Sequence, residues 1–236
     1  QGGQKDNAIT REAEAEILVL EENADAVREY AASVQRAWRE EYAGTDEGIT
    51  VTVEDEGKQE VRVLHPTSKE KVIFFLVNVP YGVQKMSGTI KGLVETSTNI
   101  GILKTSANEV MGSSSIRSSV ETARDSLSDK IAYLTEFLGG EYERQGVYPA
   151  WEYRKDSPLR DKMVEVYEKM YGQKPNVVAI HAGLECGLFY KKMEGLDCVS
   201  LGPDMKDIHT SEEVLSISST ERVWKYLVKV LEALKE

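Results

Sequence analysis

The stretch Val177-Val-Ala-Ile-His-Ala-Gly-Leu-Glu-Cys-Gly187 decides how the C-terminal part of the chain is interpreted. Its apolar start predicts a buried strand, and the residues that follow predict a loop entering a helix over 184–193. Side chains that follow a strand of an α/β sheet converge on ligands at the carboxyl edge of that sheet. We therefore expect His181, Gly183 and Glu185 to lie at a binding site.

Two glycines, Gly183 and Gly187, belong to the turn that enters this helix. Glycine lets the backbone approach a ligand closely, and the N–H groups of a helix N-terminus attract carboxylates. The alternative is that small residues serve only the tight packing of strand against helix. Cys186 is expected to be a buried apolar residue, and both it and Cys198 are expected to be reduced thiols.

A second loop, Gly202 to Glu213, carries His209 after the apolar run 198–201. A histidine in a polar loop, with Asp207 nearby, suits a metal ligand or a general base. The alternative is a solvent-exposed histidine in an acidic loop. A zinc site needs three or four ligands, and the sequence contains no His-x-Asp or Cys-x-x-Cys motif that would complete one.

Two further candidates lie in the middle of the chain. Arg117 is placed at a strand end among serines, which suits bidentate capture of a substrate carboxylate. The alternative is an exposed strand arginine beside a serine-rich turn. Asn99 either orients a carbonyl group through its amide or satisfies a neighbouring backbone group.

Hydrophobic spacing predicts an α+β arrangement for about the first 140 residues. The run 68–79 fits a strand or a helix, and we favour a helix because Ser68 can cap it and Pro80 ends it. The other predicted elements are a strand over 13–20, a helix over 25–42, a hairpin of 49–53 with 60–64, an antiparallel pair of 93–107 with 109–119, and a helix over 119–138.

The periodicity breaks at 146–156, where a domain boundary is expected. Beyond it, predicted helices alternate with predicted strands, which is typical of an α/β layer with parallel strands. The helices are expected over 158–171, 184–193 and 218–235, and the strands over 176–180 and 197–201. So short a series indicates the tail of a larger α/β domain.

The composition limits the classes of partner. The chain has 236 residues and a formal net charge of −11, which argues against nucleic acid because no basic surface dominates. No apolar run approaches the roughly 20 residues that span a bilayer, so no membrane partner is expected. The first residues lack the apolar core of a signal peptide, and we expect a cytoplasmic protein.

Several of these sequence motifs occur together, and in the same order, in one protein family. They are Gly92-Leu-Val-Glu-Thr-Ser-Thr-Asn-Ile-Gly101, Ile116-Arg-Ser118, His181-Ala-Gly-Leu-Glu-Cys-Gly187 and the Gly202-Pro dipeptide before His209. In this the chain resembles the aminoacyl-histidine dipeptidases, or Xaa-His dipeptidases, which are di-zinc metallopeptidases related to carnosinase. The match runs almost from one end of the chain to the other. It begins at Asn7-Ala-Ile-Thr-Arg-Glu-Ala13, in which Thr10 stands where the family usually has proline.

The resemblance implies an α+β lid over residues 1–148 and the C-terminal part of an α/β zinc-peptidase catalytic domain over 149–236. The lid would be a dimerisation domain without its first strand and helix, built as a β-sheet with helices on one face in ferredoxin-like repeats. It would make the protein a homodimer. In such enzymes two zinc ions, replaceable by cobalt or manganese, hold the water that attacks the peptide.

The resemblance also assigns roles to single residues. His209 would be a metal ligand. Arg117 and the turn around Gly183, flanked by His181 and Glu185, would bind the carboxylate of a dipeptide substrate, and Asn99 would help to position the peptide.

The chain has no counterpart of three features in the upstream half of the family: the His-x-Asp motif, the bridging aspartate and the Glu-Glu pair. We therefore expect a dipeptidase fragment that is inactive by itself and contains no catalytic residue. The alternatives are a non-catalytic dimerisation module and a small-molecule-binding module.

Overall fold

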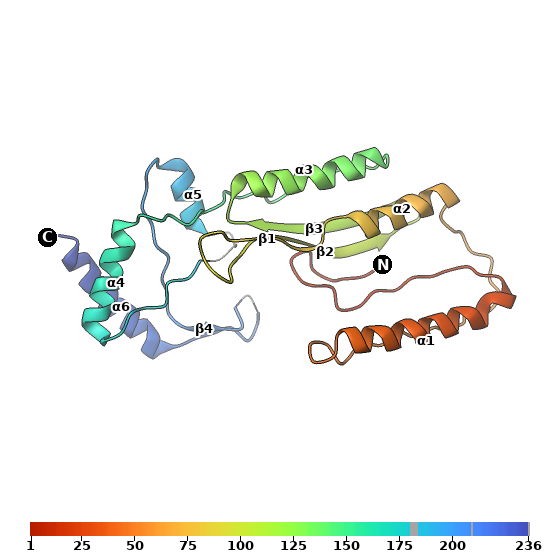
Figure 1. Cartoon of the computed structure of the whole chain (residues 1–236), viewed down its shortest axis with the longest axis horizontal. Helices are drawn as coiled ribbons and strands as arrows, with labels where there is room; N and C mark the ends of the chain where they lie inside the picture. The colour runs from red at the N-terminus through yellow and green to blue at the C-terminus, as the bar shows by residue number, and fades with distance from the viewer. Residues whose placement is uncertain (180–183, 209, 236) are drawn as a thin grey trace.

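A small antiparallel sheet forms the centre of the N-terminal half of the molecule. Its strands β1 (Gly82–Met86), β2 (Val94–Thr105) and β3 (Val110–Ser118) lie in chain order. Figure 1 shows this sheet in the middle of an elongated molecule. The pairing of β2 with β3 confirms the antiparallel pair predicted from the sequence, whereas β1 has no counterpart in that prediction.

The structure is a computed structural model, and it describes residues 1–179, 184–208 and 210–235. His181, Gly183 and His209, three of the site residues predicted above, lie outside the described residues. None of the described helices is long and apolar enough to cross a membrane.

The N-terminal segment runs beside β2 and holds it at a bulge. The register of β2 on β3 shifts between Ile100 and Ile102, and Gly3 meets the backbone of Gly101 there so closely that a Cβ on Gly3 has no room. Gly2 forms a bridge with Leu103, in which each backbone N–H donates to the other residue's carbonyl, at 2.9 and 2.8 Å. Glycine is therefore required at this crossing for its size.

Helix α3 (Glu121–Phe137) packs against the sheet and confirms the helix predicted over 119–138. Its inner side buries Leu127 and Ile131, which are 4% and 3% exposed. The hydroxyl groups of Thr96 and Ser118 are paired at 2.8 Å on neighbouring strands, and both residues are buried. The core of the sheet region therefore combines a few aliphatic side chains with hydroxyl groups that bond to one another.

Helices α1 (Ala24–Glu41) and α2 (Pro66–Asn78) precede the sheet, and α1 follows the short 3-10 turn η1 (Glu21–Asn23). Both helices were predicted, but Ser68 does not cap α2: the Nδ1 atom of His65 accepts from the N–H of Thr67 at 3.3 Å. Proline in the first turn fixes this earlier start.

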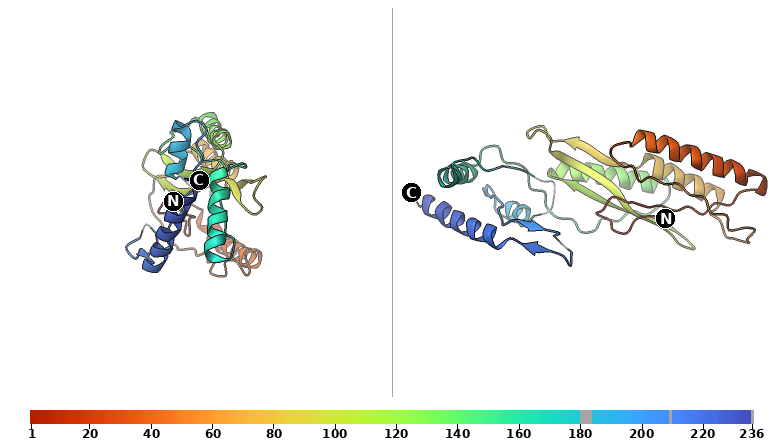
Figure 2. Two further views of the ribbon diagram at one scale, coloured as in Figure 1. Left: turned by 90° about the vertical axis from the view of Figure 1, so that its left-hand side faces the viewer. Right: turned by 90° about the horizontal axis from the view of Figure 1, so that it is seen from below.

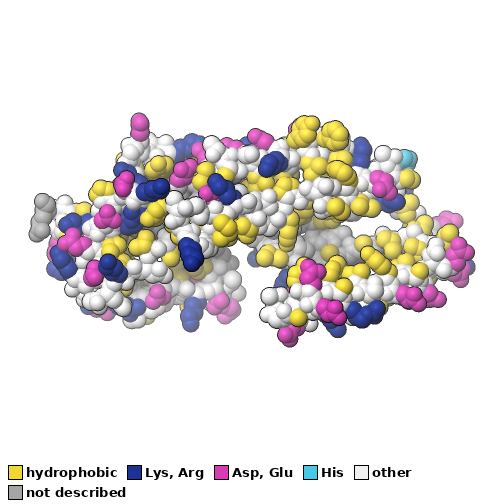
Figure 3. Space-filling model, in the orientation of Figure 1, with side chains coloured by type: hydrophobic (Ala, Val, Ile, Leu, Met, Phe, Trp, Pro, Cys, Tyr) yellow, Lys and Arg dark blue, Asp and Glu magenta, His cyan; other side chains and the backbone are white. Residues whose placement is uncertain are grey.

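Helix α1 keeps its apolar stripe largely uncovered. Tyr30 and Trp38 are 71% and 45% exposed, and none of the helix residues is buried. Figure 3 shows hydrophobic side chains along α1 and an open gap between this helix and the rest of the molecule. The amphipathic pattern of α1 is thus real, but the structure does not bury its apolar face.

The C-terminal region is organised around two long helices, α4 (Pro158–Tyr171) and α6 (Ile217–Ala233), which lie side by side in Figure 2. They share an apolar core, and the hydroxyl group of Tyr226 donates to the carbonyl of Met163 at 2.8 Å. The buried members of this core are Met163, Val166, Tyr226 and Val230. A short helix, α5 (Glu185–Lys192), lies between them in the sequence and corresponds to the helix predicted over 184–193.

The sequence prediction was wrong about several strands. In the described part of the chain, the segments 13–20, 49–53, 60–64, 176–179 and 197–201 form no strand ladder, apart from a bridge between Gly2 and Ala13. The C-terminal region instead contains a two-residue antiparallel pair, β4 (Met205–Lys206) with β5 (Val214–Leu215). A strand exists only where a second strand satisfies its backbone groups, and the sequence pattern does not supply that partner.

The expected fold is therefore seen in part. The chain is a mixed α+β structure with small antiparallel sheets, while parallel strands and ferredoxin-like repeats are not formed by the described residues. The accessible surface is 18091 Å². A compact monomer of 26.4 kDa exposes about 10,600 Å², so much of the apolar surface that a folded domain normally covers is open here.

Candidate functional site

Arg117 and Asn99 are brought onto one face of the sheet. In the β2–β3 ladder Arg117 lies opposite Ser97, and Asn99 lies opposite Ser115. Directly opposed residues share a face, and so do residues two apart on one strand. The side chains of Arg117 and Asn99 therefore project from the same face, while the buried Thr96 belongs to the other.

The guanidinium group of Arg117 is free to bind a ligand. Arg117 is half-buried, and no residue in the described ranges forms a hydrogen bond or an ion pair with its side chain. A partly buried arginine presents several donors in a planar fork that matches a carboxylate. The structure thus leaves Arg117 with the donor capacity that the sequence suggested.

Asn99 already has backbone partners. Its amide nitrogen donates to the carbonyl of Ala8 at 3.0 Å and to that of Asp6 at 3.4 Å. The nearby hydroxyl group of Thr10 donates to the carbonyl of Ile100 at 3.1 Å. Asn99 therefore fixes the N-terminal segment on β2, which agrees with the second of the two roles considered for it.

Helix α5 carries Glu185 as its first residue, as predicted for a turn that enters a helix. A Cβ atom on Gly187 would lie 2.7 Å from the carbonyl oxygen of Pro149, closer than real Cβ contacts come. Gly187 is buried, and its small size lets α5 pack directly on the linker between the two regions. At this glycine the packing explanation holds.

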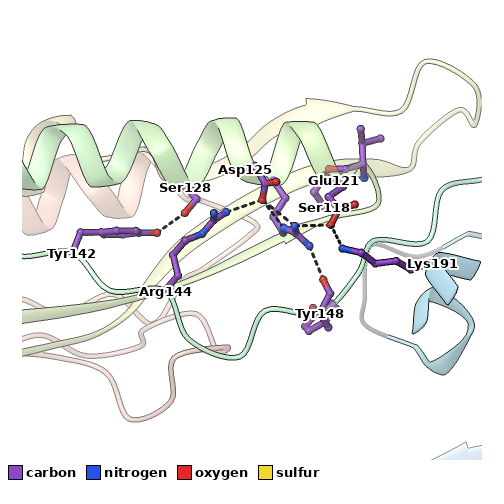
Figure 4. A network of polar contacts seen from close by, with 10 residues as sticks. Ser118, Glu121, Asp125, Ser128, Tyr142, Arg144, Tyr148 and Lys191 are labelled. Atoms are coloured by element: carbon purple, nitrogen blue, oxygen red, sulfur yellow. Dashed lines mark hydrogen bonds and ion pairs between the residues drawn. The ribbon is translucent and has the colours of Figure 1, made fainter. Parts of the chain in front are cut away.

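Five charged side chains meet where the two regions join, and we call them the junction network: Glu121, Arg124, Asp125, Arg144 and Lys191. Arg124 belongs to the first turns of α3, and Figure 4 shows the other four, which come from the same turns, from the linker after α3 and from α5. The Nζ atom of Lys191 lies 3.1 Å from Oε1 of Glu121, although the two residues are 70 positions apart. Arg144 donates to Oδ1 of Asp125 at 2.7 Å.

Arg124 is the most buried side chain of the junction network, with 13% of its side chain exposed. Its guanidinium group lies 3.1 Å from Glu121 and 2.9 Å from Asp125, and it donates to the carbonyl of Tyr148 at 2.6 Å. This single side chain therefore ties α3 to the linker.

The network keeps its carboxylates ionised. The hydrogen bonds from Lys191 and then from Arg124 lower the pKa of Glu121 below its ordinary value. The hydrogen bond from Arg124, with a second from Arg144, lowers the pKa of Asp125 against the opposing effect of burial. Both acids are charged at neutral pH, so the network is a set of ion pairs and not of neutral hydrogen bonds.

Cys198 and Cys186 lie close together near the same linker. The thiol of Cys198 lies 3.9 Å from the carbonyl oxygen of Cys186, and both cysteines are free and half-buried. Burial, and then the neighbouring thiol of Cys186, raise the pKa of Cys198 to about 11. A thiol that resists ionisation is a poor nucleophile, in keeping with the expected role of reduced packing residues.

The described residues do not fit a resident zinc centre. Within residues 1–179, 184–208 and 210–235 there is no group of three or more His, Cys, Asp or Glu side chains that could hold a metal ion. Zinc takes at least three protein ligands. His65, a histidine inside these ranges, uses its Nδ1 atom at the start of α2.

Sequence reasoning missed the junction network. One signal was readable: Glu121 and Arg124 are three apart at a helix start, the spacing of an i,i+3 ion pair. The contribution of Lys191 was not readable, because only the folded chain brings α5 to α3.

No family model matches the chain. The curated cytosol non-specific dipeptidase of Escherichia coli (strain K12) is 31% identical over 230 residues, which are 98% of this chain and 47% of that protein. The crystal structure of aminoacylhistidine dipeptidase from Vibrio alginolyticus superposes with a TM-score of 0.89 at 34% identity, over 98% of this chain and 47% of that one.

Aminopeptidase PepT from Bacillus cereus ATCC 10987 shares the fold alone, with a TM-score of 0.55 and 15% identity over 72% of this chain and 46% of its own. The chain spans about half the length of the curated relative it matches. Sequence and structure agree over nearly all of the chain. The chain is homologous to the cytosol non-specific dipeptidases and the aminoacylhistidine dipeptidases over about half of their length.

Proposed function

We propose that this chain is the substrate-carboxylate-binding part of a cytoplasmic, metal-dependent dipeptidase that acts on Xaa-His and other dipeptides. Residues 1–148 act as its lid and dimerisation domain, and residues 149–236 as the returning part of its catalytic domain. Homology to dipeptidases over 98% of the chain supports the substrate class. The observation that carries the binding role is the half-buried Arg117, whose guanidinium group has no partner among the described residues.

Arg117 binds the carboxylate at the C-terminus of the dipeptide in a bidentate manner. Asn99, on the same face of the sheet, positions the peptide through the backbone segment that its amide holds. Glu185, the first residue of α5, is proposed to border the same substrate site, together with the preceding sequence positions His181 and Gly183. None of these roles requires proton transfer, so they describe substrate binding and not catalysis.

His209 is proposed as a zinc ligand, with cobalt or manganese as replacements, on its sequence context alone. The described residues provide no group of ligands that could hold a metal ion. Hydrolysis then depends on further metal ligands and on a catalytic glutamate. The family motifs that carry these residues are absent from the sequence. We propose that the chain by itself binds dipeptide but does not cleave it.

Titration calorimetry of the whole chain with Gly-His tests the binding role. Arg117→Ala should weaken binding by about 10- to 150-fold, because a hydrogen bond to a charged group contributes about 1.5–3 kcal/mol. Arg117→Lys should recover part of the affinity, since an ammonium group keeps the charge without the planar fork. Arg62→Ala is the matched control, because Arg62 is an exposed arginine of the same region with no bonded partner in the described chain. Equal affinities for Arg117→Ala and the unchanged chain would refute the assignment.

A dimer through the lid is the second part of the proposal. The open apolar stripe of α1 and an accessible surface of 18091 Å² support association through the N-terminal region. Sedimentation equilibrium should show a mass that rises toward twice 26.4 kDa with concentration. Tyr30→Glu, on the exposed stripe, should shift this equilibrium toward monomer, whereas Tyr133→Glu on α3 is the control. A chain that stays monomeric at every concentration would exclude the dimer.

A further inference from the structure

We propose that the junction network docks α5 against the end of β3, and that Lys191 and Arg124 are therefore positioning residues for the carboxylate site. The inference rests on the proposed function, which assigns substrate binding to Arg117 near the end of β3 and to Glu185 at the start of α5. Figure 4 shows the network spanning from α3 to α5.

The connection from Arg117 to Glu121 is short and fixed. Ser118 accepts from the N–H of Val120 at 3.1 Å and donates to the carbonyl of Val120 at 2.9 Å. Its hydroxyl group also pairs with that of Thr96 on β2. A buried turn held in this way transmits the position of α3 to the end of β3.

Helix α5 is too short to hold its place alone. It has eight residues, with Glu185 at its start and Lys191 in its last turn. Isolated helices below about 12 residues are marginal in water, so α5 depends on what it packs against. The ion pair of Lys191 with Glu121 links its last turn to α3.

The contacts close a ring around the junction. Arg124 joins α3 to the carbonyl of Tyr148, and the next carbonyl along the linker, that of Pro149, is the group against which Gly187 packs. From Gly187 the helix leads to Lys191, and Lys191 returns to Glu121. Because the ring is closed, α5 cannot move relative to β3 without breaking an ion pair or the packing at Gly187.

The charges fit a docking role. Two carboxylates face three cationic side chains in the network, and every one of them has a partner from another turn or another segment. The Lys191–Glu121 pair is partly exposed, with 59% and 41% of the two side chains accessible, so its contribution is small and sensitive to salt. Arg124 is the buried member that fixes the linker.

Hydrogen exchange of the α5 amides in the full chain tests the docking. Lys191→Ala should speed exchange about two- to five-fold at low salt, as expected for an exposed ion pair, and Lys191→Arg should restore the slow rate. Lys192→Ala is the matched control: it removes the same charge from the same helix turn, and Lys192 has no partner in the described chain. Gly187→Ala should speed exchange further, with Gly202→Ala, which meets open space, as its control.

The affinity for Gly-His tests the positioning role of Lys191. The dissociation constant for Gly-His should rise by about the same two- to five-fold in Lys191→Ala, and Lys191→Arg should recover it. Equal α5 exchange in Lys191→Ala and Lys192→Ala would overturn the docking. Faster exchange with unchanged Gly-His affinity would overturn the positioning role alone. Absence of Gly-His binding by the unsubstituted chain would overturn the proposed function, and α5 exchange would still decide whether the network docks the helix.

Discussion

The sheet region around β2 and the helix pair of α4 and α6 bury different kinds of side chain. Thr96, Thr98 and Ser118 are buried in the sheet, and Leu127 and Ile131 are buried on α3. The helix pair shares a core of apolar side chains, in which the hydroxyl group of Tyr226 donates to a backbone carbonyl, and the hydroxyl groups of Ser157 and Ser219 are buried at the helix starts. In the sheet, the buried hydroxyl groups of Thr96 and Ser118 pair, while that of Thr98 has no partner within the described residues. The core of the helix pair is mainly apolar.

The two regions should therefore draw their stability from different kinds of side chain. A hydroxyl pair such as that of Thr96 and Ser118 contributes about 1 kcal/mol net, because water offers the same hydrogen bonds to the unfolded chain. A buried aliphatic side chain contributes more. The sheet region should therefore depend on the two aliphatic residues of α3, whereas the helix pair spreads its stability over several side chains.

The largest expected effect is that of Ile131→Ala. Ile131 is 3% exposed, and its truncation should lower the free energy of unfolding of the sheet region by about 2–5 kcal/mol through lost burial and a cavity. Hydrogen exchange of the β2 and β3 amides measures this free energy directly. The amides of α4 and α6 should keep their protection.

Met163→Ala is the reciprocal variant. Met163 is 7% exposed in the core shared by α4 and α6, and its truncation should weaken protection there and spare the sheet. Loss of protection in both regions from either substitution would mean that the two regions unfold as one unit. The sheet region and the helix pair would then share one source of stability.

The helices were predictable because their signals are local. Ser157 caps α4 by accepting from the N–H of Arg160 at 3.1 Å, proline follows it, and Gly172 ends the helix in the left-handed conformation. These signals mark the two ends of the predicted range 158–171, which agrees with α4 at both ends.

The strands were predictable only where the partner was adjacent in sequence. β2 and β3 are joined by a short turn, and they pair as expected. The segment 197–201 was also predicted as a strand, but it lies against α4 and forms no ladder with the described residues. Alternation and β-branched residues indicate that a segment can be a strand, and they do not say whether a second strand meets it.

The candidate site shows the same limit. The shared face of Arg117 and Asn99 follows from strand alternation, which the sequence contains. The ion pair of Lys191 with Glu121 joins residues 70 positions apart, so it depends on the whole fold. The glycine at 187 was recognised, but only the structure shows that Pro149 is what it packs against.

The smallest expected effect concerns Asp197, which links segment 197–201 to the start of α4. Its carboxylate accepts from the hydroxyl group of Ser157 at 2.7 Å and from the N–H of Leu159 at 3.0 Å. Burial acts to raise the pKa of Asp197, but these two hydrogen bonds and the nearby charges of Arg154 and Arg160 together lower the pKa below the ordinary 3.8. The contribution to stability is therefore present above pH 3.8 and is lost as the pH falls through the lower value in the folded chain.

Helix content followed by circular dichroism during thermal unfolding should reveal this effect as a difference between variants. The melting temperature of Asp197→Asn should lie below that of the unchanged chain at pH 6, and the two should converge below pH 3.8. Asp156→Asn removes a neighbouring exposed carboxylate that has no bonded partner in the described chain, and it should leave the melting temperature unchanged. If Asp156→Asn lowers it as much as Asp197→Asn, the acid sensitivity of α4 reflects overall charge and not its cap. Apolar packing would then be the principal force that holds the helix pair, and the contrast with the sheet would be sharper.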